Sequence, residues 1–229
     1  YFAGFKVNSG EYKLMGLAPY GKPIFVDKIK KIVDIKSDGS FRLDQSYFNY
    51  ATGFTMTSKK FNKLFDAKPR NPTNEKINQF HMDIAASIQS VTEEIILKIS
   101  ENVQQQFKID NLCLAGGVAL NCVANGKILK EKIFKKIWIQ PAAGDAGGSL
   151  GAALALWYNE FDQDRIINKN DSMKGSYLGP HFEEIEIEKQ LISANAKFRI
   201  FSEDELLDIV TDDLANGMAV GWFQGRMEF

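Results

Sequence analysis

The stretch LAGGVALNCVANGKI, from Leu114 to Ile128, is the part of this 229-residue sequence that indicates its fold. An apolar run leads into two adjacent glycines, and a helical pattern follows from about Ala119 to Lys132. Glycine lets a backbone approach a ligand closely, and N–H groups at a helix start favour anions. The stretch therefore predicts a strand, a turn and a helix, with a nucleotide at the turn. A tight core turn explains the glycines equally well, because neither G-x-G-x-x-G nor a P-loop is present.

A second stretch, QPAAGDAGGS at 140–149, shows the same arrangement between a predicted strand at 136–140 and a predicted helix at 147–160. Strands that alternate with helices predict parallel βαβ pairing, and ligands of open α/β sheets bind where the strands end. Asp145 stands among small residues in this turn. Its carboxylate suits a divalent metal bound to nucleotide phosphates, and capping of the next helix is the alternative.

The region before these turns predicts a small hairpin and one long helix. Turn residues at 37–40 precede Phe41–Leu43, which favours the hairpin. From Glu75 to Phe107, apolar residues recur at steps of three and four, as on one face of a helix. These residues are Ile77, Phe80, Ile84, Ile88, Val91, Ile95 and Ile99.

The region after the turns predicts a linker and a second unit. Residues 161–175 are polar, and we place domains at 1–165 and 177–229 with a linker at 166–176. Ser202 and Glu205 have the spacing of a capping box for a helix that ends at Gly217. The apolar run Met218–Phe223 then predicts a buried strand.

Composition excludes several classes of function. The formal net charge is −1, so no basic field favours nucleic acid as a partner. No stretch has the roughly 20 apolar residues of a membrane span. Cys113 and Cys122 form no C-x-x-C pair, which favours a reducing cytoplasm. The sequence begins at Tyr1 and stops after an apolar run, so we expect part of a longer protein.

Two further sets of residues carry weaker signals. Glu11 and Lys13 lie in the glycine-rich segment 10–21 and could contact ribose and phosphate, although an exposed ion pair is the common alternative. His81 and His181 are far apart in sequence and form no histidine-rich metal motif. The sequence identifies no catalytic residue.

Four ordered segments together resemble the carbamoyltransferase family of nodulation protein U and the antibiotic O-carbamoyltransferases. They are GEYKLMGLAPYG (10–21), MDIAASIQSVTEE (82–94), LAGGVALNCVANGKI (114–128) and IQPAAGDAGGSLGAAL (139–154). The last three are more distantly similar to the ATPase that makes threonylcarbamoyladenosine in tRNA. SYLGP (176–180) and GWFQGRMEF (221–229) resemble the start of the second domain of the carbamoyltransferase family.

This resemblance implies an α/β fold in two parts. Residues 1–165 would be the second half of an actin/Hsp70-type nucleotide-binding domain. Residues 177–229 would begin an α/β domain similar to threonylcarbamoyl-adenylate synthase.

The resemblance also implies an ATP-dependent reaction. Carbamoyl phosphate and ATP would give a carbamoyl adenylate, and the carbamoyl group would pass to a hydroxyl of a small-molecule acceptor. Asp145 would bind a metal, which the resemblance implies is iron(II), with histidine ligands upstream of Tyr1. Nucleotide contacts by motif position are Gly116, Gly117, Asn121, Gly147 and Gly148, with Glu11 and Lys13 as weaker candidates. Arg226 and Glu228 would stand at the edge of the adenylation site.

Two alternatives stay open at this point. One is an enzyme similar to the tRNA threonylcarbamoyl transferase, and the other is a non-catalytic actin/Hsp70-type scaffold in which Asp145 only caps its helix. We expect the 229 residues alone to be inactive, because groups that complete both sites would lie outside them. The sequence identifies neither the acceptor nor the oligomeric state.

Overall fold

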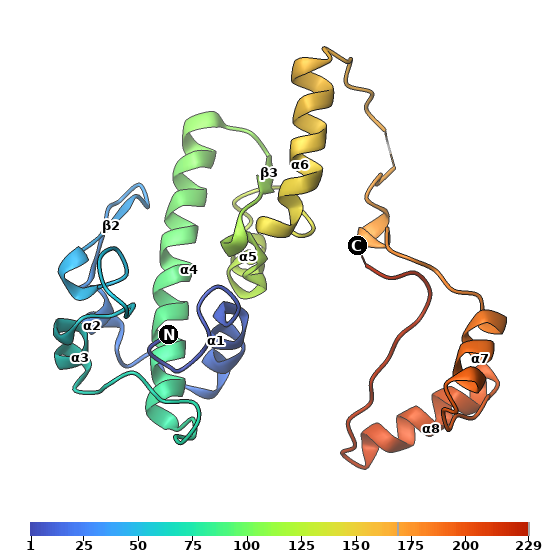
Figure 1. Ribbon diagram of the computed structural model, residues 1–229. Coiled ribbons are helices and arrows are strands. Elements are labelled where there is room, and N and C mark those ends of the chain that lie inside the picture. Colours follow the sequence, from blue (N-terminus) through green and yellow to red (C-terminus); the bar gives the residue numbers. More distant parts are fainter. Residues whose placement is uncertain (169, 229) are drawn as a thin grey trace. The chain divides into compact units, whose positions relative to one another are not determined.

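The computed structural model describes residues 1–168 and 170–228, and the chain divides into two units, Tyr1–Trp157 and Tyr158–Phe229 (Figure 1). The first unit mixes helices with two small sheets, which confirms the α/β class. The actin/Hsp70-type fold, the synthase-like second domain and the domain limits stay predictions. Lys169 of the predicted linker and Phe229 of the predicted second domain lie outside the described residues.

The first unit is built around one long helix. Its helices and strands are α1 (Glu11–Leu17), α2 (Val26–Ile29), β1 (Val33–Ile35), β2 (Phe41–Leu43), α3 (Lys59–Phe65), α4 (Gln79–Phe107), β3 (Asn111–Leu114), α5 (Cys122–Lys130), β4 (Lys136–Ile139) and α6 (Gly148–Ala155). Strands β1 and β2 pair antiparallel, with Val33 opposite Leu43, so the predicted hairpin is confirmed.

Helix α4 runs for 29 residues, about 43 Å at 1.5 Å per residue, and confirms the helix predicted from periodicity. A capping box fixes its start: the Asn78 side chain accepts from the His81 N–H, and the His81 ring accepts from the Asn78 N–H. It ends at Phe107, and its C-cap residue Lys108 has a φ of 53°, in the left-handed region. Both ends are therefore set by local interactions.

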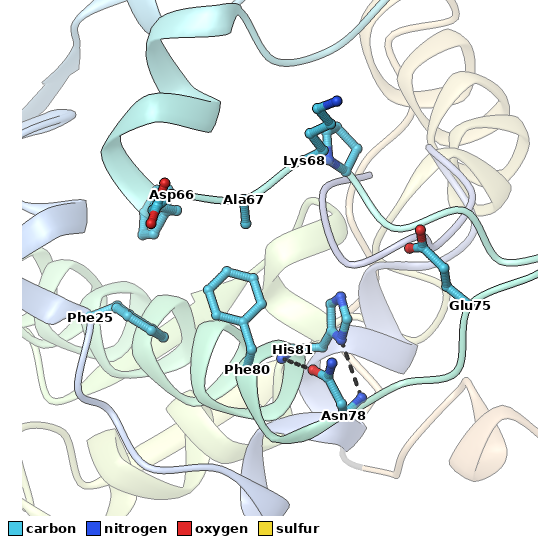
Figure 2. A pocket seen from close by; sticks show the side chains of 10 residues that line it. Phe25, Asp66, Ala67, Lys68, Glu75, Asn78, Phe80 and His81 are labelled. Carbon is cyan, nitrogen blue, oxygen red and sulfur yellow. Dashed lines mark hydrogen bonds between the residues drawn. The ribbon is translucent and has the colours of Figure 1, made fainter.

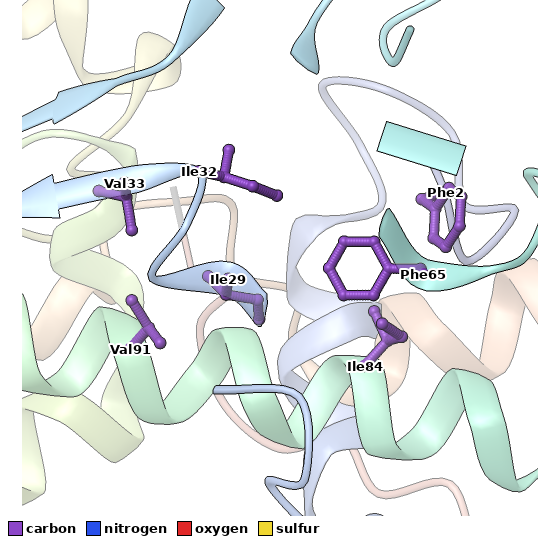
Figure 3. Close-up of a cluster of buried hydrophobic side chains, with 7 residues drawn as sticks. All are labelled: Phe2, Ile29, Ile32, Val33, Phe65, Ile84 and Val91. Atoms are coloured by element: carbon purple, nitrogen blue, oxygen red, sulfur yellow. The ribbon is translucent and has the colours of Figure 1, made fainter. Parts of the chain in front are cut away.

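The hydrophobic core lies along one side of α4 (Figure 3). Ile84 and Val91 project from the helix toward side chains of the N-terminal segment, α2, β1 and α3. Aromatic rings fill much of this layer, with Phe61 4.9 Å from Phe2 and 4.8 Å from Phe65 between ring centroids. The seven buried members are Phe2, Ile29, Ile32, Val33, Phe65, Ile84 and Val91.

The segment from Gly21 to Phe25 is held on another face of α4 by hydrogen bonds. The Lys22 N–H donates to Asp83 Oδ1 at 2.8 Å, and the Phe25 N–H donates to Ser87 Oγ at 3.0 Å. Gly21 lies so close to the Met82 carbonyl that a side chain at this position would collide with it. The glycine is therefore required for this segment to reach the helix.

Strands β3 and β4 pair in parallel, as predicted, with Asn111 opposite Lys136 and Leu114 opposite Ile139. The helices that follow begin later than expected. A 3-10 turn, η3 (Gly117–Leu120), precedes α5, and a second, η4 (Asp145–Gly147), precedes α6. Helix α6 continues as a π-helical turn through Glu160. The glycine-rich stretches thus form tight turns before each helix starts.

A network of polar side chains joins α4 to α5. Gln89 and Asn121 exchange two hydrogen bonds between their side-chain amides, each 3.0 Å long. Gln89 also donates to Glu93 at 2.9 Å, and Glu93 forms an ion pair with Lys127. Gln89 and Glu93 are buried, so these bonds replace the water that both side chains lose.

The second unit contains two longer helices, α7 (Glu184–Ser193) and α8 (Glu203–Ala215). The predicted capping box of Ser202 and Glu205 is confirmed. The strand predicted at Met218–Phe223 is wrong: this run has no regular structure. An apolar run becomes a strand only with a hydrogen-bonded neighbour, and no strand of the described second unit supplies one.

Among the described residues, no helix combines the length and the apolar character that crossing a bilayer requires.

We predict that Ile128→Ala lowers the free energy of unfolding by about 2–5 kcal/mol, because the substitution opens a cavity in a packed region. Ile128 is fully buried, whereas its neighbour Leu129 is 60% exposed. Leu129→Ala on the same helix should lower the free energy of unfolding by less than about 0.5 kcal/mol. Urea unfolding of the full-length protein measures both, and equal losses would contradict the packing described for α5.

We also predict that Gln89→Ala lowers the free energy of unfolding by about 1–3 kcal/mol, because the amide of Asn121 and the carboxylate of Glu93 each lose a buried partner. Gln106→Ala is the matched control, since Gln106 is exposed on the same helix. The same unfolding experiment compares the two variants. A Gln89→Ala protein as stable as the control would show that the network contributes no net stability.

Candidate functional site

The two glycine-rich turns meet where β3 and β4 end. Beyond the ladder, the Gln140 N–H donates to the Leu114 carbonyl at 3.0 Å. The Gly116 N–H donates to the Ala143 carbonyl at 2.8 Å. A Cβ built on Gly144 would lie 3.7 Å from the Cα of Gly117. The structure therefore brings together two of the segments that the sequence analysis selected.

Gly116 and Gly117 leave an open surface at this edge. Gly116 has a φ of 99°, a conformation that favours glycine, whereas Gly117 opens η3. A Cβ on either residue would meet no atom within 4 Å. The N–H groups of Gly117 and Val118 donate to no backbone acceptor in the part of the chain that the structure describes. An anion could therefore approach these N–H groups without meeting a side chain of the turn itself.

Asp145 stands at the start of η4, on the second turn, and is exposed. It does not cap a helix: Gly144 precedes η4 and Gly147 precedes α6, and neither cap includes a side-chain hydrogen bond. Within residues 1–168 and 170–228, its carboxylate has no hydrogen-bond or ion-pair partner. It is therefore available to a ligand.

A complete metal site is not found among these residues. No group of three histidine, cysteine, aspartate or glutamate side chains that could hold an ion occurs in the described part of the chain. The oxygen of Asp145 suits a hard or borderline divalent cation. The described residues can thus supply one ligand, and any others would have to come from elsewhere.

Gly147 and Gly148 differ in the space that surrounds them in the second turn. A Cβ on Gly147 would collide with the Ala142 carbonyl oxygen, so the turn itself requires glycine there. A Cβ on Gly148 would point into open space. Ala142 adopts a φ of 49°, in the left-handed region that non-glycine residues seldom occupy. The fold therefore accounts for Gly147 and leaves Gly148 unexplained.

Asn121 follows the first turn and bonds to both α4 and α5 through its side chain. Its Oδ1 accepts from the Ala124 N–H at 3.1 Å, which caps α5, and also from Gln89. Its Nδ2 donates to Gln89, so the amide has little capacity left for a nucleotide. The sequence analysis missed Gln89, although its four-residue spacing from Glu93 matches one helical turn.

Glu11 and Lys13 lie on α1 and are exposed. The Glu11 carboxylate accepts from the N–H groups of Asn8 at 2.9 Å and Gly10 at 3.0 Å. Hydrogen bonds from its own backbone and from these two N–H groups hold its pKa below the ordinary value. The Lys13 ammonium lies 5.7 Å from the centre of the Tyr12 ring. Glu11 thus orders its own loop, and within the described chain it makes no ion pair with Lys13.

Arg226 and Glu228 lie in the second unit and are exposed. Arg226 Nη1 donates to the Gly179 carbonyl at 2.6 Å. Two backbone bonds of 2.9 Å join Met227 to Gly179 and Pro180. The two segments that resemble the start of a second domain are therefore neighbours in this unit.

Comparison with known proteins gives the family. The model described as carbamoyltransferase N-terminus matches residues 1–154. An uncharacterized protein of Synechocystis sp. is 56% identical over the whole chain, which covers 38% of that protein. Nodulation protein NolNO of Sinorhizobium fredii is 33% identical over 96% of the chain and 30% of its own length. Nodulation protein NolO of Bradyrhizobium diazoefficiens is 32% identical over 96% of the chain and 37% of its own length.

The chain thus spans 30–38% of the length of these three relatives. The family match covers both glycine-rich turns and most of the first unit. Because this match extends over more than half of the sequence, the chain belongs to the carbamoyltransferase family.

Proposed function

We propose that the protein containing this chain is an ATP-dependent O-carbamoyltransferase. Carbamoyl phosphate and ATP would form a carbamoyl adenylate, from which the carbamoyl group passes to a hydroxyl of a small-molecule acceptor. Family membership supports carbamoyl transfer, and an acceptor of low molecular mass in the cytoplasm is part of the same proposal. Nucleic acid and membrane are not among the partners that we propose.

The observation that carries this proposal is the convergence of two glycine-rich turns beside an unpaired carboxylate. Open N–H groups of Gly117 and Val118 would hold a phosphate of the nucleotide. Asp145 would hold a divalent metal, which we propose to be iron(II), and such a metal polarises a carbonyl and neutralises phosphate charge. The missing capping bond at Asp145 favours this role over that of a structural cap in a non-catalytic scaffold.

The other candidate residues have supporting roles in the proposed mechanism. Gly148 and Gly147 would let the second turn approach phosphate, and Asn121 would position the first turn through Gln89. Glu11 and Lys13 stay candidate nucleotide contacts. Arg226 and Glu228 stay candidates for the adenylate-forming site of the second unit.

We predict that Asp145→Asn in the full-length protein lowers kcat/KM for carbamoyl transfer by about a hundredfold and lowers bound metal in parallel, because a ligand is lost. Elemental analysis and a transfer assay measure the two effects. Asp164→Asn is the matched control, since Asp164 is exposed and lies outside the turns. Metal content and rate that both stay at the level of this control would support the non-catalytic scaffold instead.

We predict that Gly117→Ala weakens ATP binding by about tenfold or more while stability changes by less than about 0.5 kcal/mol. The added methyl group meets nothing in the protein but stands where phosphate would approach. Gly126→Ala on α5 is the control, because its Cβ also meets no atom within 4 Å. Calorimetric titration with ATP compares them, and equal affinities would place the nucleotide elsewhere.

A further inference from the structure

A cavity of about 630 Å³ lies beside the first turn of α3. Its volume is within the range of small-molecule sites. Lys59 and Lys68 line it, and no aspartate or glutamate does so in the part of the chain that the structure describes. The other polar side chains of the lining are Asn49, Thr55, Thr57, Ser58 and Asn62. The proposed carbamoyl transfer uses none of these residues.

The two lysine side chains of this cavity are free to bind an anion. Among the described residues, neither Lys59 nor Lys68 forms an ion pair. Lys60, the next residue along α3, is engaged instead, because its ammonium pairs with Asp44 at 3.1 Å. The cavity therefore presents two positive charges that no carboxylate of its lining offsets.

The surrounding segment adds to this positive charge. Residues 21–70 hold 11 lysine and arginine residues against five aspartates, whereas the whole chain has a formal net charge of −1. Asp66 and Glu75 line a neighbouring cavity, shown in Figure 2, and not this one. Lys68 borders both cavities, and Figure 2 shows its ammonium directed away from His81. Charge of one sign around a cavity raises the local concentration of ligands of the opposite sign, so this cavity favours an anion.

Two residues of the lining hold buried oxygens that lack a partner. In the described part of the chain, Thr57 Oγ1 and Asn62 Oδ1 are the buried side-chain polar atoms without a hydrogen bond. By contrast, the Thr55 hydroxyl donates to the Thr57 carbonyl at 3.1 Å, and the Ser58 hydroxyl donates to the Ser46 carbonyl at 2.9 Å. A buried polar atom without a partner costs free energy, so two in one lining require an explanation. A ligand with hydroxyl groups supplies it, because a hydroxyl can donate to the amide oxygen and accept from the threonine.

We propose that this cavity binds a small phosphorylated polyol, such as a sugar phosphate. The phosphate accepts from the ammonium groups of Lys59 and Lys68, and its charge of nearly −2 suits two such groups better than a single carboxylate does. Hydroxyl groups of the ligand bond to Thr57 and Asn62, whose side chains rotate to turn their free oxygens into the cavity. The site shares no residue with the glycine turns and does not depend on the proposed carbamoyl transfer.

Glucose 6-phosphate is the probe for the experiment, and glucose and inorganic phosphate each carry one half of its chemistry. Calorimetric titration of the full-length protein should give a Kd of about 0.1–1 mM for glucose 6-phosphate, as expected for a ligand of this size. Glucose and inorganic phosphate should each bind at least about tenfold more weakly. Either half binding as tightly as the whole probe, or no binding of glucose 6-phosphate at about 20 mM, overturns the proposal.

Two lysine variants locate the phosphate of the probe. Lys59→Gln and Lys68→Gln should each weaken binding of glucose 6-phosphate by about fivefold or more, because each removes a charge-assisted bond. Lys63→Gln is the matched control, since Lys63 is exposed on the same helix as Lys59 and lies outside the lining. The control should bind as the wild type does. Affinity that is unchanged in both cavity variants overturns the proposal.

Asn62→Leu tests the contacts with the hydroxyl groups. The substitution roughly keeps the volume and removes a buried oxygen that has no partner within the described chain, so stability should not fall. Binding of glucose 6-phosphate should weaken by about fivefold, while the affinity for inorganic phosphate stays the same. An affinity for glucose 6-phosphate equal to that of the wild type overturns the proposal.

Gly117→Ala separates this site from the proposed carbamoyl-transfer site. The variant should bind glucose 6-phosphate as the wild type does, because Gly117 is not part of the lining. A loss of about fivefold or more in this variant would place the probe at the glycine turns. That result overturns the cavity proposal and leaves the proposed function intact.

Discussion

The unbroken register of α4 is the constraint on which the first unit depends. Successive residues of an α-helix turn by about 100°, so a continuous helix fixes the direction of every side chain along it. Ile84 and Val91 enter the aromatic core, while Asp83 and Ser87 hold the segment that follows Gly21. Gln89 turns toward α5 and the first glycine turn. A kink in the helix would separate these contacts from one another.

Much of the first unit follows from local patterns in the sequence. The apolar spacing along 77–99 predicts α4, and the strand, turn and helix order predicts the parallel pairing of β3 with β4. The adjacency of the two glycine turns follows from that pairing. These features were predictable because each depends on short-range periodicity or on a general rule of sheet topology.

Other features depend on contacts that no local pattern encodes. Gln89 and Asn121 are 32 positions apart, and nothing near either residue specifies its partner. Met218–Phe223 has the composition of a strand but lacks a neighbour to pair with. Helix α5 starts at Cys122 because the chain first completes a 3-10 turn. Composition therefore identifies an apolar run, whereas tertiary pairing decides what the run becomes.

The capping box of α4 has one more consequence. The hydrogen bond from the Asn78 N–H satisfies the helix start and also sets the tautomer of His81. Fraying of the first turn would release the ring, and the donor on Nε2 would no longer be fixed. Protonation at Nδ1 would remove the acceptor that the Asn78 N–H uses. The order of the first turn of α4 therefore depends on the protonation state of His81.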